Sequence, residues 1–309
     1  MNQSLSLPSF AKINWSLRIL GKRLDDFHEV RTTLQTISLH DRLNFELRED
    51  QQVVLSCSDP EIPTDDRNLI VRAAHALRDR YSINKGVRVK LEKKIPVQAG
   101  LGGGSSDAAV ALLALGNLWQ IDARANDLIE IAARIGADVP FFLLGGSALA
   151  TGTGTTLSQL PDSEKYHLIV IAPCLSVSTR DAYGSLRAAA LTSDPSEFIL
   201  FSSQKAVNSR DSLPWLRNDF ENDFESVIFD IHPEIRRAKD QLLASGATAA
   251  LLTGSGSSVF GVFANHESQQ QALEKIQCEA GWRIFPCVTV SRNEYRHAIG
   301  DELFRSYAL

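Results

Sequence analysis

The sequence predicts a protein of the α+β class with two domains. Strand-like and helix-like segments alternate through the first half of the chain, and a second β-rich run, EKYHLIVIAPCLSVS, follows a turn at Pro161. With 309 residues, the chain is long enough for two domains of ordinary size. We therefore expect one domain over residues 1–160 and a second over residues 161–309.

The spacing of apolar residues predicts the elements of the first domain. In GVRVKLE, apolar and charged residues alternate as in a half-buried strand, whereas SSDAAVALLALGNLWQ is apolar at helical spacing over much of its circumference. The segment DVPFFLLGGSALATGTGTTL has strand character. In chain order, we expect strands over 9–20 and 41–50, a helix over 68–82, a strand over 86–96, and helices over 105–120 and 125–136.

The second domain is expected to begin with a strand in residues 164–178. Residues 184–218 contain turn-rich pieces and little periodicity, which indicates an irregular insertion. A helix over 233–246 ends at a glycine, AALLTGSGSSVFGVF predicts two strands joined by a loop, and a further helix is expected over 267–281.

Composition excludes several classes of function. The formal net charge of −5 offers no basic surface for nucleic acid, so a small-molecule substrate is the better expectation. No segment approaches the ~18 apolar residues of a membrane-spanning helix. The N-terminal residues lack the pattern of a secretion signal, and the four cysteines lack the spacing of a structural zinc site. We therefore expect a cytoplasmic protein with reduced thiols and no membrane partner.

A glycine-rich stretch, PVQAGLGGGSSDAAV, occupies residues 96–110. No lysine follows the glycines, which excludes a Walker A loop, and Ser105 stands where a dinucleotide fingerprint needs its third glycine after Gly100 and Gly102. Glycines before a helix start allow close approach of an anion to free amides. On spacing alone, the equal alternative is that Ser105 or Ser106 is an N-cap and Asp107 a first-turn acid that complements the helix dipole.

The chain resembles the GHMP kinases, which include galactokinase, homoserine kinase and mevalonate kinase. IPVQAGLGGGSSDAA resembles their phosphate-binding motif, and AKINWSLRILGKRLDDFHEV and LLTGSGSSVFGVF follow family patterns in the same order. DDRNLIVRAA, GADVPFFLLGGSALATGTG and ENDFE extend the similarity over about residues 8–265, apart from 184–218. The resemblance is strongest to the branch that phosphorylates the 2-hydroxyl of cytidine diphosphate methylerythritol with ATP.

The resemblance implies an N-terminal domain like ribosomal protein S5 domain 2, a ferredoxin-like C-terminal domain and a site in the cleft between them. It places ATP on Gln98, Ala99, Gly100, Leu101, Gly102, Gly103, Gly104, Ser105, Ser106, Asp107 and Ala108, and the adenine beside Asn68 and Leu69. Asn68 is equally an N-cap. Gly254, Ser255 and Gly256 are expected to face the substrate diphosphate, with a plain hairpin turn as the alternative.

The resemblance also implies a catalytic pair, Lys12 and Asp138. A carboxylate at Asp138 would accept the proton of the attacking alcohol, while the ammonium of Lys12 keeps it ionised and offsets developing charge. Without the resemblance, an aspartate in GADVP is more often a turn or cap residue. Asn14 lies two residues after Lys12 on the same strand face, and the resemblance gives it the methylerythritol hydroxyls.

The cytosine ring is expected to stack between Phe27 and Tyr183 and to hydrogen-bond with His28, with Thr179 nearby. Here the sequence departs from the family pattern DGYHE, because DDFHE lacks both the glycine and the tyrosine. The departure changes the backbone angles open to the turn and removes one hydroxyl. On the residues alone, Phe27 as a core anchor and His28 as a surface histidine are the alternatives.

ATP chemistry implies Mg²⁺, for which Ser106 or Asp107 are candidates, although no dedicated metal site is evident. Three other functions remain open on the sequence. The chain could act on another small alcohol, such as homoserine or mevalonate, or be a non-catalytic sensor with the GHMP fold. RNA binding by the S5-like half is the third, and the acidic balance opposes it. The sequence does not indicate the oligomeric state.

Overall fold

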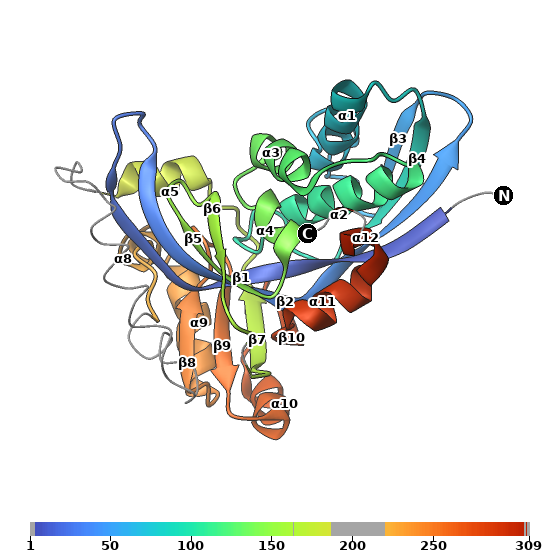
Figure 1. The fold of residues 1–309 in the computed structure, drawn as a ribbon. Coiled ribbons are helices and arrows are strands. Elements are labelled where there is room, and N and C mark those ends of the chain that lie inside the picture. The colour runs from blue at the N-terminus through green and yellow to red at the C-terminus, as the bar shows by residue number, and fades with distance from the viewer. Residues whose placement is uncertain (1–3, 163, 187–219, 306, 308–309) are drawn as a thin grey trace.

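The computed structural model describes residues 4–162, 164–186, 220–305 and 307, and it contains two sheets with their own helices (Figure 1). The α+β class predicted from the sequence is confirmed. The irregular insertion expected over 184–218 lies almost entirely outside the described residues. No helix within the described ranges is long and apolar enough to cross a membrane.

The first sheet is built around a long antiparallel hairpin of β1 and β2. The other strands join β2 in the order β3-β4-β2-β5-β6, and among these described strands only β3 and β4 pair in parallel. The pairing of β1 with β2 shifts register at three places, one of them between Asn14 and Ser16. The bounds are β1 Ser4–Lys22, β2 His28–Arg48, β3 Val53–Cys57, β4 Gly86–Glu92, β5 Ser147–Thr151 and β6 Thr156–Gln159.

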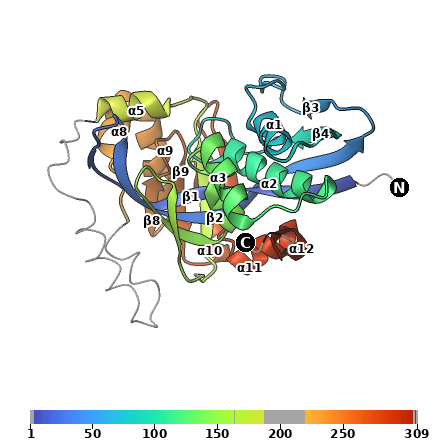
Figure 2. The ribbon, with the colours of Figure 1, turned by 45° about the horizontal axis from the view of Figure 1, so that its top comes forward.

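Helices α1 to α4 contribute to the core of the first unit, and Figures 1 and 2 show α1, α2 and α3 grouped beside the sheet. Their bounds are α1 Leu69–Tyr81, α2 Gly103–Leu118, α3 Ala125–Ile135 and α4 Val139–Leu144. Helix α2 is buried on nearly every side, as its apolar sequence predicts. The expected strand after Asp138 is wrong in its first part, because VPFFLL forms α4 with a proline in its first turn, and strand begins only at Ser147.

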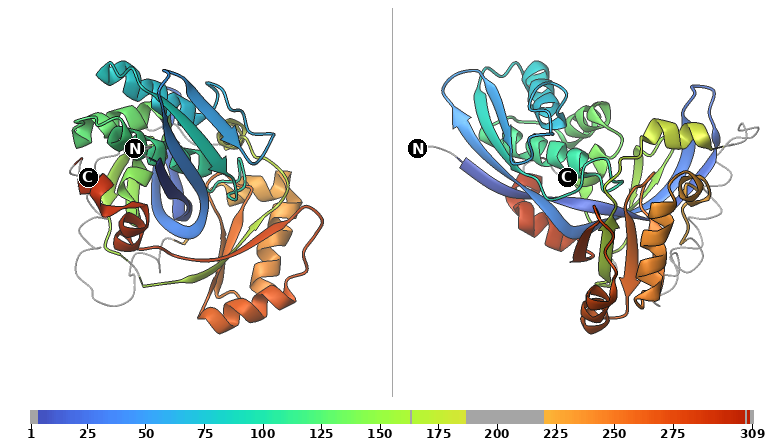
Figure 3. Two further views of the ribbon diagram at one scale, coloured as in Figure 1. Left: turned by 90° about the vertical axis from the view of Figure 1, so that its right-hand side faces the viewer. Right: turned by 180° about the vertical axis from the view of Figure 1, so that it is seen from behind.

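The second sheet is antiparallel at each of its described pairings, in the order β10-β7-β9-β8. Its strands are β7 His167–Ala172, β8 Ala249–Leu252, β9 Val259–Phe263 and β10 Arg283–Val288. Its helices are α5 Thr179–Ser185, α8 Glu225–Ile231, α9 Pro233–Ala244 and α10 His266–Lys275. Helix α5 lies beside the turn that joins β1 to β2, as Figures 1 and 3 show from opposite sides.

The division between the two units is not a single cut at residue 160. Helices α11 (Arg292–Ile299) and α12 (Asp301–Arg305) follow β10 but return to the first unit. There Tyr295, Leu303 and Phe304 belong to the same apolar core as α2. The apolar faces of α11 and α12 are buried against this core, so the last described segment differs from the expected 161–309 domain.

Strand β1 links the two units through its alternating side chains. Ala11, Ile13 and Trp15 point into an apolar cluster that includes Leu168 and Phe260 of the second sheet. Successive strand residues face opposite sides, so Lys12 and Asn14 point the other way. The packing between the sheets thereby fixes the direction in which these two polar side chains project.

Candidate active site

A cavity of about 1560 Å³ is lined by residues from both units. Most of the residues predicted from the sequence line this cavity, which therefore brings the glycine loop together with Lys12, Asp138 and Tyr183. Among the predicted residues whose side chains the structure describes, three do not line it: Ser106, Ala108 and Gly256. The backbone of Thr179 begins α5 at one edge of the second unit.

The glycine loop runs directly into α2, and its glycines adopt backbone angles that favour glycine. Gly100 has φ +75°, and Gly102 occupies the N-cap with φ +69°. The helix begins at Gly103, two residues earlier than expected, and Gly102 has no side chain with which to cap it. The alternative in which Ser105 or Ser106 is the N-cap is therefore wrong. The amides of the first turn have no acceptor within the helix, so they can bind an anion.

Both units hold the glycine loop in place. The Lys12 amide donates to the Leu101 carbonyl at 2.9 Å, and the Ser258 amide donates to the Ala99 carbonyl at 3.1 Å. A Cβ atom on Gly100 would lie 2.1 Å from the Thr253 carbonyl oxygen. The glycine loop thus packs between β1 and the loop after β8. Only glycine at position 100 allows the chain to lie this close to the Thr253 carbonyl.

Lys12 and Asp138 both line the cavity, and their charged groups lie beside each other. The Lys12 Nζ atom lies 3.7 Å from Asp138 Oδ2, and the Lys12 side chain is 4% exposed while that of Asp138 is 39% exposed. Asp138 stands at the N-cap of α4, but its side chain makes no cap hydrogen bond to that described helix. Its carboxylate is therefore available to the cavity, as a proton acceptor must be.

Asn14 is buried and its side-chain oxygen is already occupied. Asn14 Oδ1 accepts hydrogen bonds from Lys12 Nζ at 2.7 Å, the Gly254 amide at 2.9 Å and Thr253 Oγ1 at 3.2 Å. Its Nδ2 donates to Thr32 Oγ1 at 2.7 Å. This side chain orients Lys12 and joins it to the second unit. Asn14 also lines the cavity, so its expected role in binding substrate hydroxyls stays a prediction.

The loop after β8 is held by Asn222, a residue that the sequence analysis did not single out. Asn222 Nδ2 donates to the carbonyls of Leu252 and Gly254, both at 2.8 Å, and Asn222 Oδ1 accepts from the Phe224 amide. Gly254 and Ser255 line the cavity as expected, whereas Gly256 faces Leu252 within the second unit. The only signal for Asn222 in the sequence is its place in ENDFE.

At the far end of the cavity, His28 lies flat against Tyr183, with ring centroids 4.8 Å apart and an interplanar angle of 25°. Phe27 also lines the cavity and is 63% exposed. Tyr183 thus stacks on His28 and not on Phe27. Burial and the nearby Lys22 lower the pKa of His28, which favours the neutral imidazole. Burial raises the pKa of Tyr183 to about 12, and the charge of Asp138 adds to this shift.

The turn before Phe27 keeps the backbone form that a glycine would adopt. Asp26 stands where the family pattern has glycine, and its φ is +65°. Aspartate is one of the few residues that tolerate this region. The Asp25 carboxylate accepts from the Phe27 amide at 3.2 Å, and Lys22 Nζ lies 2.7 Å from Asp26 Oδ1. Local polar contacts therefore offset the lost glycine.

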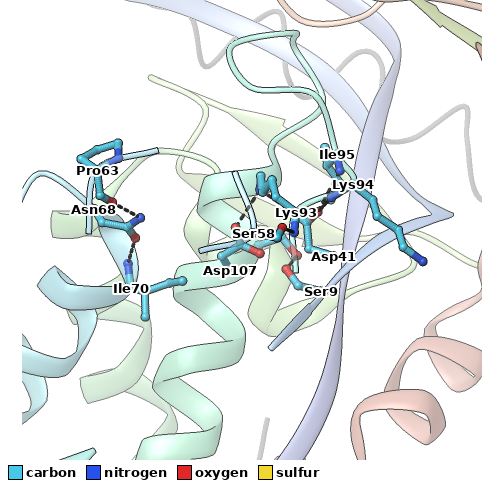
Figure 4. A network of polar contacts seen from close by, with 11 residues as sticks. Ser9, Asp41, Ser58, Pro63, Asn68, Ile70, Lys93, Lys94, Ile95 and Asp107 are labelled. Carbon is cyan, nitrogen blue, oxygen red and sulfur yellow. Dashed lines mark hydrogen bonds and ion pairs between the residues drawn. The ribbon is translucent and has the colours of Figure 1, made fainter. Parts of the chain in front are cut away.

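Asn68 and Leu69 lie at the other end of the glycine loop. Asn68 is the N-cap of α1, since its Oδ1 accepts from the Ile70 amide and its Nδ2 donates to the Pro63 carbonyl (Figure 4). Leu69 is the nearest side chain to the space beside Gly104. The capping alternative thus describes the Asn68 side chain, and Leu69 supplies an apolar wall to the cavity.

The two candidate Mg²⁺ ligands are buried, with 0% of Ser106 and 2% of Asp107 exposed. Ser106 Oγ accepts from Ser9 Oγ at 2.8 Å, and Asp107 Oδ2 accepts from Lys93 Nζ at 2.8 Å. Among the described residues, no group of three histidine, cysteine, aspartate or glutamate side chains could hold a metal ion. Because Ser106 and Asp107 are buried and already bonded to Ser9 and Lys93, they do not fit a protein-held Mg²⁺ ion. Mg²⁺ usually keeps most of its ligands as water or phosphate oxygens.

Comparison with known proteins defines the class first. Residues 68–146 match the GHMP kinases N terminal domain, and residues 203–281 match the GHMP kinases C terminal domain. The chain therefore belongs to the GHMP kinase family. Homoserine kinase from Cytophaga hutchinsonii shares its fold, with a TM-score of 0.71 at 19% identity over 94% of this chain and 96% of that one.

More similar proteins carry one name. The chain is 41% identical to 4-diphosphocytidyl-2-C-methyl-D-erythritol kinase of Prosthecochloris aestuarii over 92% of this chain and 98% of the relative. It is 42% identical to the protein of that name from Chlorobium phaeobacteroides over 84% and 90%. A crystal structure of 4-(cytidine 5'-diphospho)-2C-methyl-D-erythritol kinase matches with a TM-score of 0.73 at 33% identity, covering 92% of this chain and 99% of that one.

Proposed function

We propose that this protein is a kinase that transfers the γ-phosphoryl group of ATP to the 2-hydroxyl of 4-diphosphocytidyl-2-C-methyl-D-erythritol. The products are ADP and the 2-phosphate, a precursor in the non-mevalonate route to isoprenoids. The observation that carries the proposal is the Lys12–Asp138 pair, which lies in one cavity with an uncapped helix start and a pair of stacked rings.

The proposed reaction uses these groups in order. The amides at the start of α2 bind the ATP phosphates, and the helix dipole favours their negative charge. Asp138 accepts the proton of the 2-hydroxyl as its oxygen attacks the γ-phosphorus, and Lys12 offsets the charge that develops on this oxygen. Positioning supplies much of the rate, because the nucleophile is a tertiary alcohol that must approach in line.

The proposed ATP binds with Mg²⁺ on its phosphate oxygens, where the ion neutralises phosphate charge. Protein groups complete the phosphate environment through backbone amides and the nearby Lys12. The cytidine end of the alcohol substrate occupies the part of the cavity lined by Phe27, His28 and Tyr183. A neutral imidazole at His28 offers one donor and one acceptor to the edge of cytosine.

The partners that we propose are small molecules only, and the formal net charge of −5 supports this. A location in the cytoplasm, where ATP is made and used, fits this activity. Homoserine and mevalonate are the rival alcohols. The aromatic end of the cavity favours a substrate with a flat base, which neither rival contains.

Release of ADP by the purified protein tests the proposal. The assay compares cytidine diphosphate methylerythritol, homoserine and mevalonate at equal concentration, with Asp138→Asn as the matched inactive variant. We expect ADP release with the cytidine substrate alone, and only from the wild-type protein. A preference for homoserine or mevalonate would refute the substrate, and no release with any alcohol would favour a ligand sensor.

A further inference from the structure

A buried ammonium lies beside the glycine loop, at the wall of the cavity, and takes no part in the proposed reaction. Lys93 Nζ donates to Asp107 Oδ2 at 2.8 Å and to Asp41 Oδ2 on its other side (Figure 4). The Lys93 side chain is 7% exposed, and those of Asp41 and Asp107 are 0% and 3% exposed. We name these three residues the Lys93 cluster.

The Lys93 cluster joins three segments that surround the glycine loop. Asp41 belongs to β2, Lys93 directly follows β4, and Asp107 belongs to α2. Asp41 Oδ1 also accepts hydrogen bonds from the amides of Lys94 and Ile95, which lead into the loop. The cluster therefore fixes the chain both before the loop and after it.

The ammonium also touches the helix start itself. A Cβ atom on Gly103 would lie 3.0 Å from Lys93 Nζ and 2.9 Å from Ile95 Cγ2. Gly103 is the first residue of α2, so the helix packs on the cluster at the turn whose amides are uncapped. A hydrogen bond from Ser9 Oγ to Ser106 Oγ ties the same turn to β1.

The charges of the cluster do not balance, because two carboxylates share one ammonium. Asp107 Oδ1 has no hydrogen-bond partner within the described part of the chain. Burial raises the pKa of Asp107 to about 6, and the negative charge of Asp41 adds to this shift, while Lys93 and the Ser9 hydroxyl oppose it. A buried charge group of this kind is a poor source of stability. The position of the Lys93 cluster beside the glycine loop indicates a role in the site and not in stability.

We propose that Lys93 is a positioning residue for nucleotide binding. By bridging Asp41 and Asp107, it holds the first turn of α2 in the orientation in which the uncapped amides bind the ATP phosphates. The inference rests on the proposed function, because it assigns these amides to ATP. The inference adds Lys93 as a group that acts on the phosphates through the backbone of α2.

Lys93→Met tests this role, and Lys94→Met is its matched control. Methionine keeps much of the length and the apolar stem of lysine without the charge. Lys94 is the next residue, its side chain is exposed, and Figure 4 shows it directed away from the cluster. We expect Lys93→Met to raise both the Kd for ATP in calorimetry and the KM for ATP at least tenfold. The KM for the alcohol and both constants of Lys94→Met should change less than twofold.

A second variant covers the chance that Lys93→Met fails to fold with two unpaired carboxylates. Lys93→Met combined with Asp107→Asn removes one of these charges, and we expect the same loss of ATP affinity. ATP affinity within twofold of wild type in either folded variant would overturn the inference, as would an equal rise in the KM of both substrates. A wild-type protein that binds ATP but phosphorylates no alcohol would contradict the proposed function instead.

Discussion

Lys12 and Asn14 project from the same face of β1, and the Lys12 ammonium donates a 2.7 Å hydrogen bond to the Asn14 side-chain oxygen. The same oxygen accepts from the Gly254 amide, and Asn222 holds the carbonyl of that glycine. One amide side chain thereby connects Lys12 to the second unit. The position of Lys12 relative to Asp138 depends on the packing between the two units.

We expect Asn14→Ala to lower kcat by about 100-fold, because a displacement of about 1 Å in a catalytic group costs this much. The variant removes the acceptor for Lys12 and Gly254 but leaves the glycine loop intact. The Kd for ATP should stay within threefold of wild type. Ser16→Ala is the matched control, since Ser16 is also buried in β1 and its hydroxyl donates to Thr33 Oγ1 at 3.3 Å. Steady-state rates that are equal in the two variants would contradict this role.

Phe27→Ala should raise the KM for the cytidine substrate roughly tenfold, because the stacking of one base on an aromatic ring contributes about 1–3 kcal/mol. The KM for ATP should not change, since Phe27 lies at the opposite end of the cavity from the glycine loop. Leu24→Ala serves as the control, because Leu24 is fully exposed in the same turn and does not line the cavity. Equal effects of Phe27→Ala on both substrates would argue against stacking.

Asp107 should make the free energy of unfolding depend on pH. Its pKa is about 6 in the folded protein, against an ordinary value of 3.8, so the folded state binds more protons between these pH values. The free energy of unfolding therefore falls as pH rises from the ordinary value toward the folded-state pKa. Urea unfolding of Asp107→Asn should lack this part of the decline. Parallel pH curves for the two proteins would show that Asp107 does not titrate in this range.

Gly100→Ala should destabilise the protein by at least about 2 kcal/mol, because its Cβ would collide with the Thr253 carbonyl at a positive φ. Gly104→Ala is the matched change in the same loop, and its Cβ meets no described atom closer than 3.8 Å. Position 104 lies in the first turn of α2, where alanine favours the helix by up to about 1 kcal/mol. Thermal unfolding of both variants gives the comparison. A Gly100→Ala variant as stable as Gly104→Ala would contradict the close contact between Gly100 and the Thr253 carbonyl.

The sequence predicted helix α2, strand β4 and most of the residues that share the cavity, but only the last part of strand β2. Helix α2 and strand β4 have periodic apolar patterns, and such patterns depend little on distant contacts. The segment VPFFLL was mistaken for strand because a short apolar run has the same composition in either state. Helices α11 and α12 pack on the first unit because their apolar faces meet its core. No local sequence pattern indicates which of the cores these faces will meet.

The motifs located Lys12, Asp138 and the glycine loop, but they did not give the contacts of each side chain. For Asn14, the motifs did not indicate that its oxygen accepts hydrogen bonds from Lys12 and Gly254. Asn222 and Lys93 had no assigned role, because the Gly254 carbonyl lies 32 residues from Asn222 and the Asp107 carboxylate lies 14 residues from Lys93. Long-range hydrogen bonds of this kind are set by the packing of the units and not by spacing along the chain.

The position of the transferred phosphate tests the central claim most directly. Phosphorus–carbon coupling in the NMR spectrum of the product, made from cytidine diphosphate methylerythritol and ATP, identifies the carbon that bears the new phosphate. We predict coupling to the quaternary carbon 2 and to its methyl group, and no product from Asp138→Asn. Two-bond coupling of the new phosphate to another carbon of the erythritol chain and none to carbon 2, or the same product from Asp138→Asn, would contradict the account.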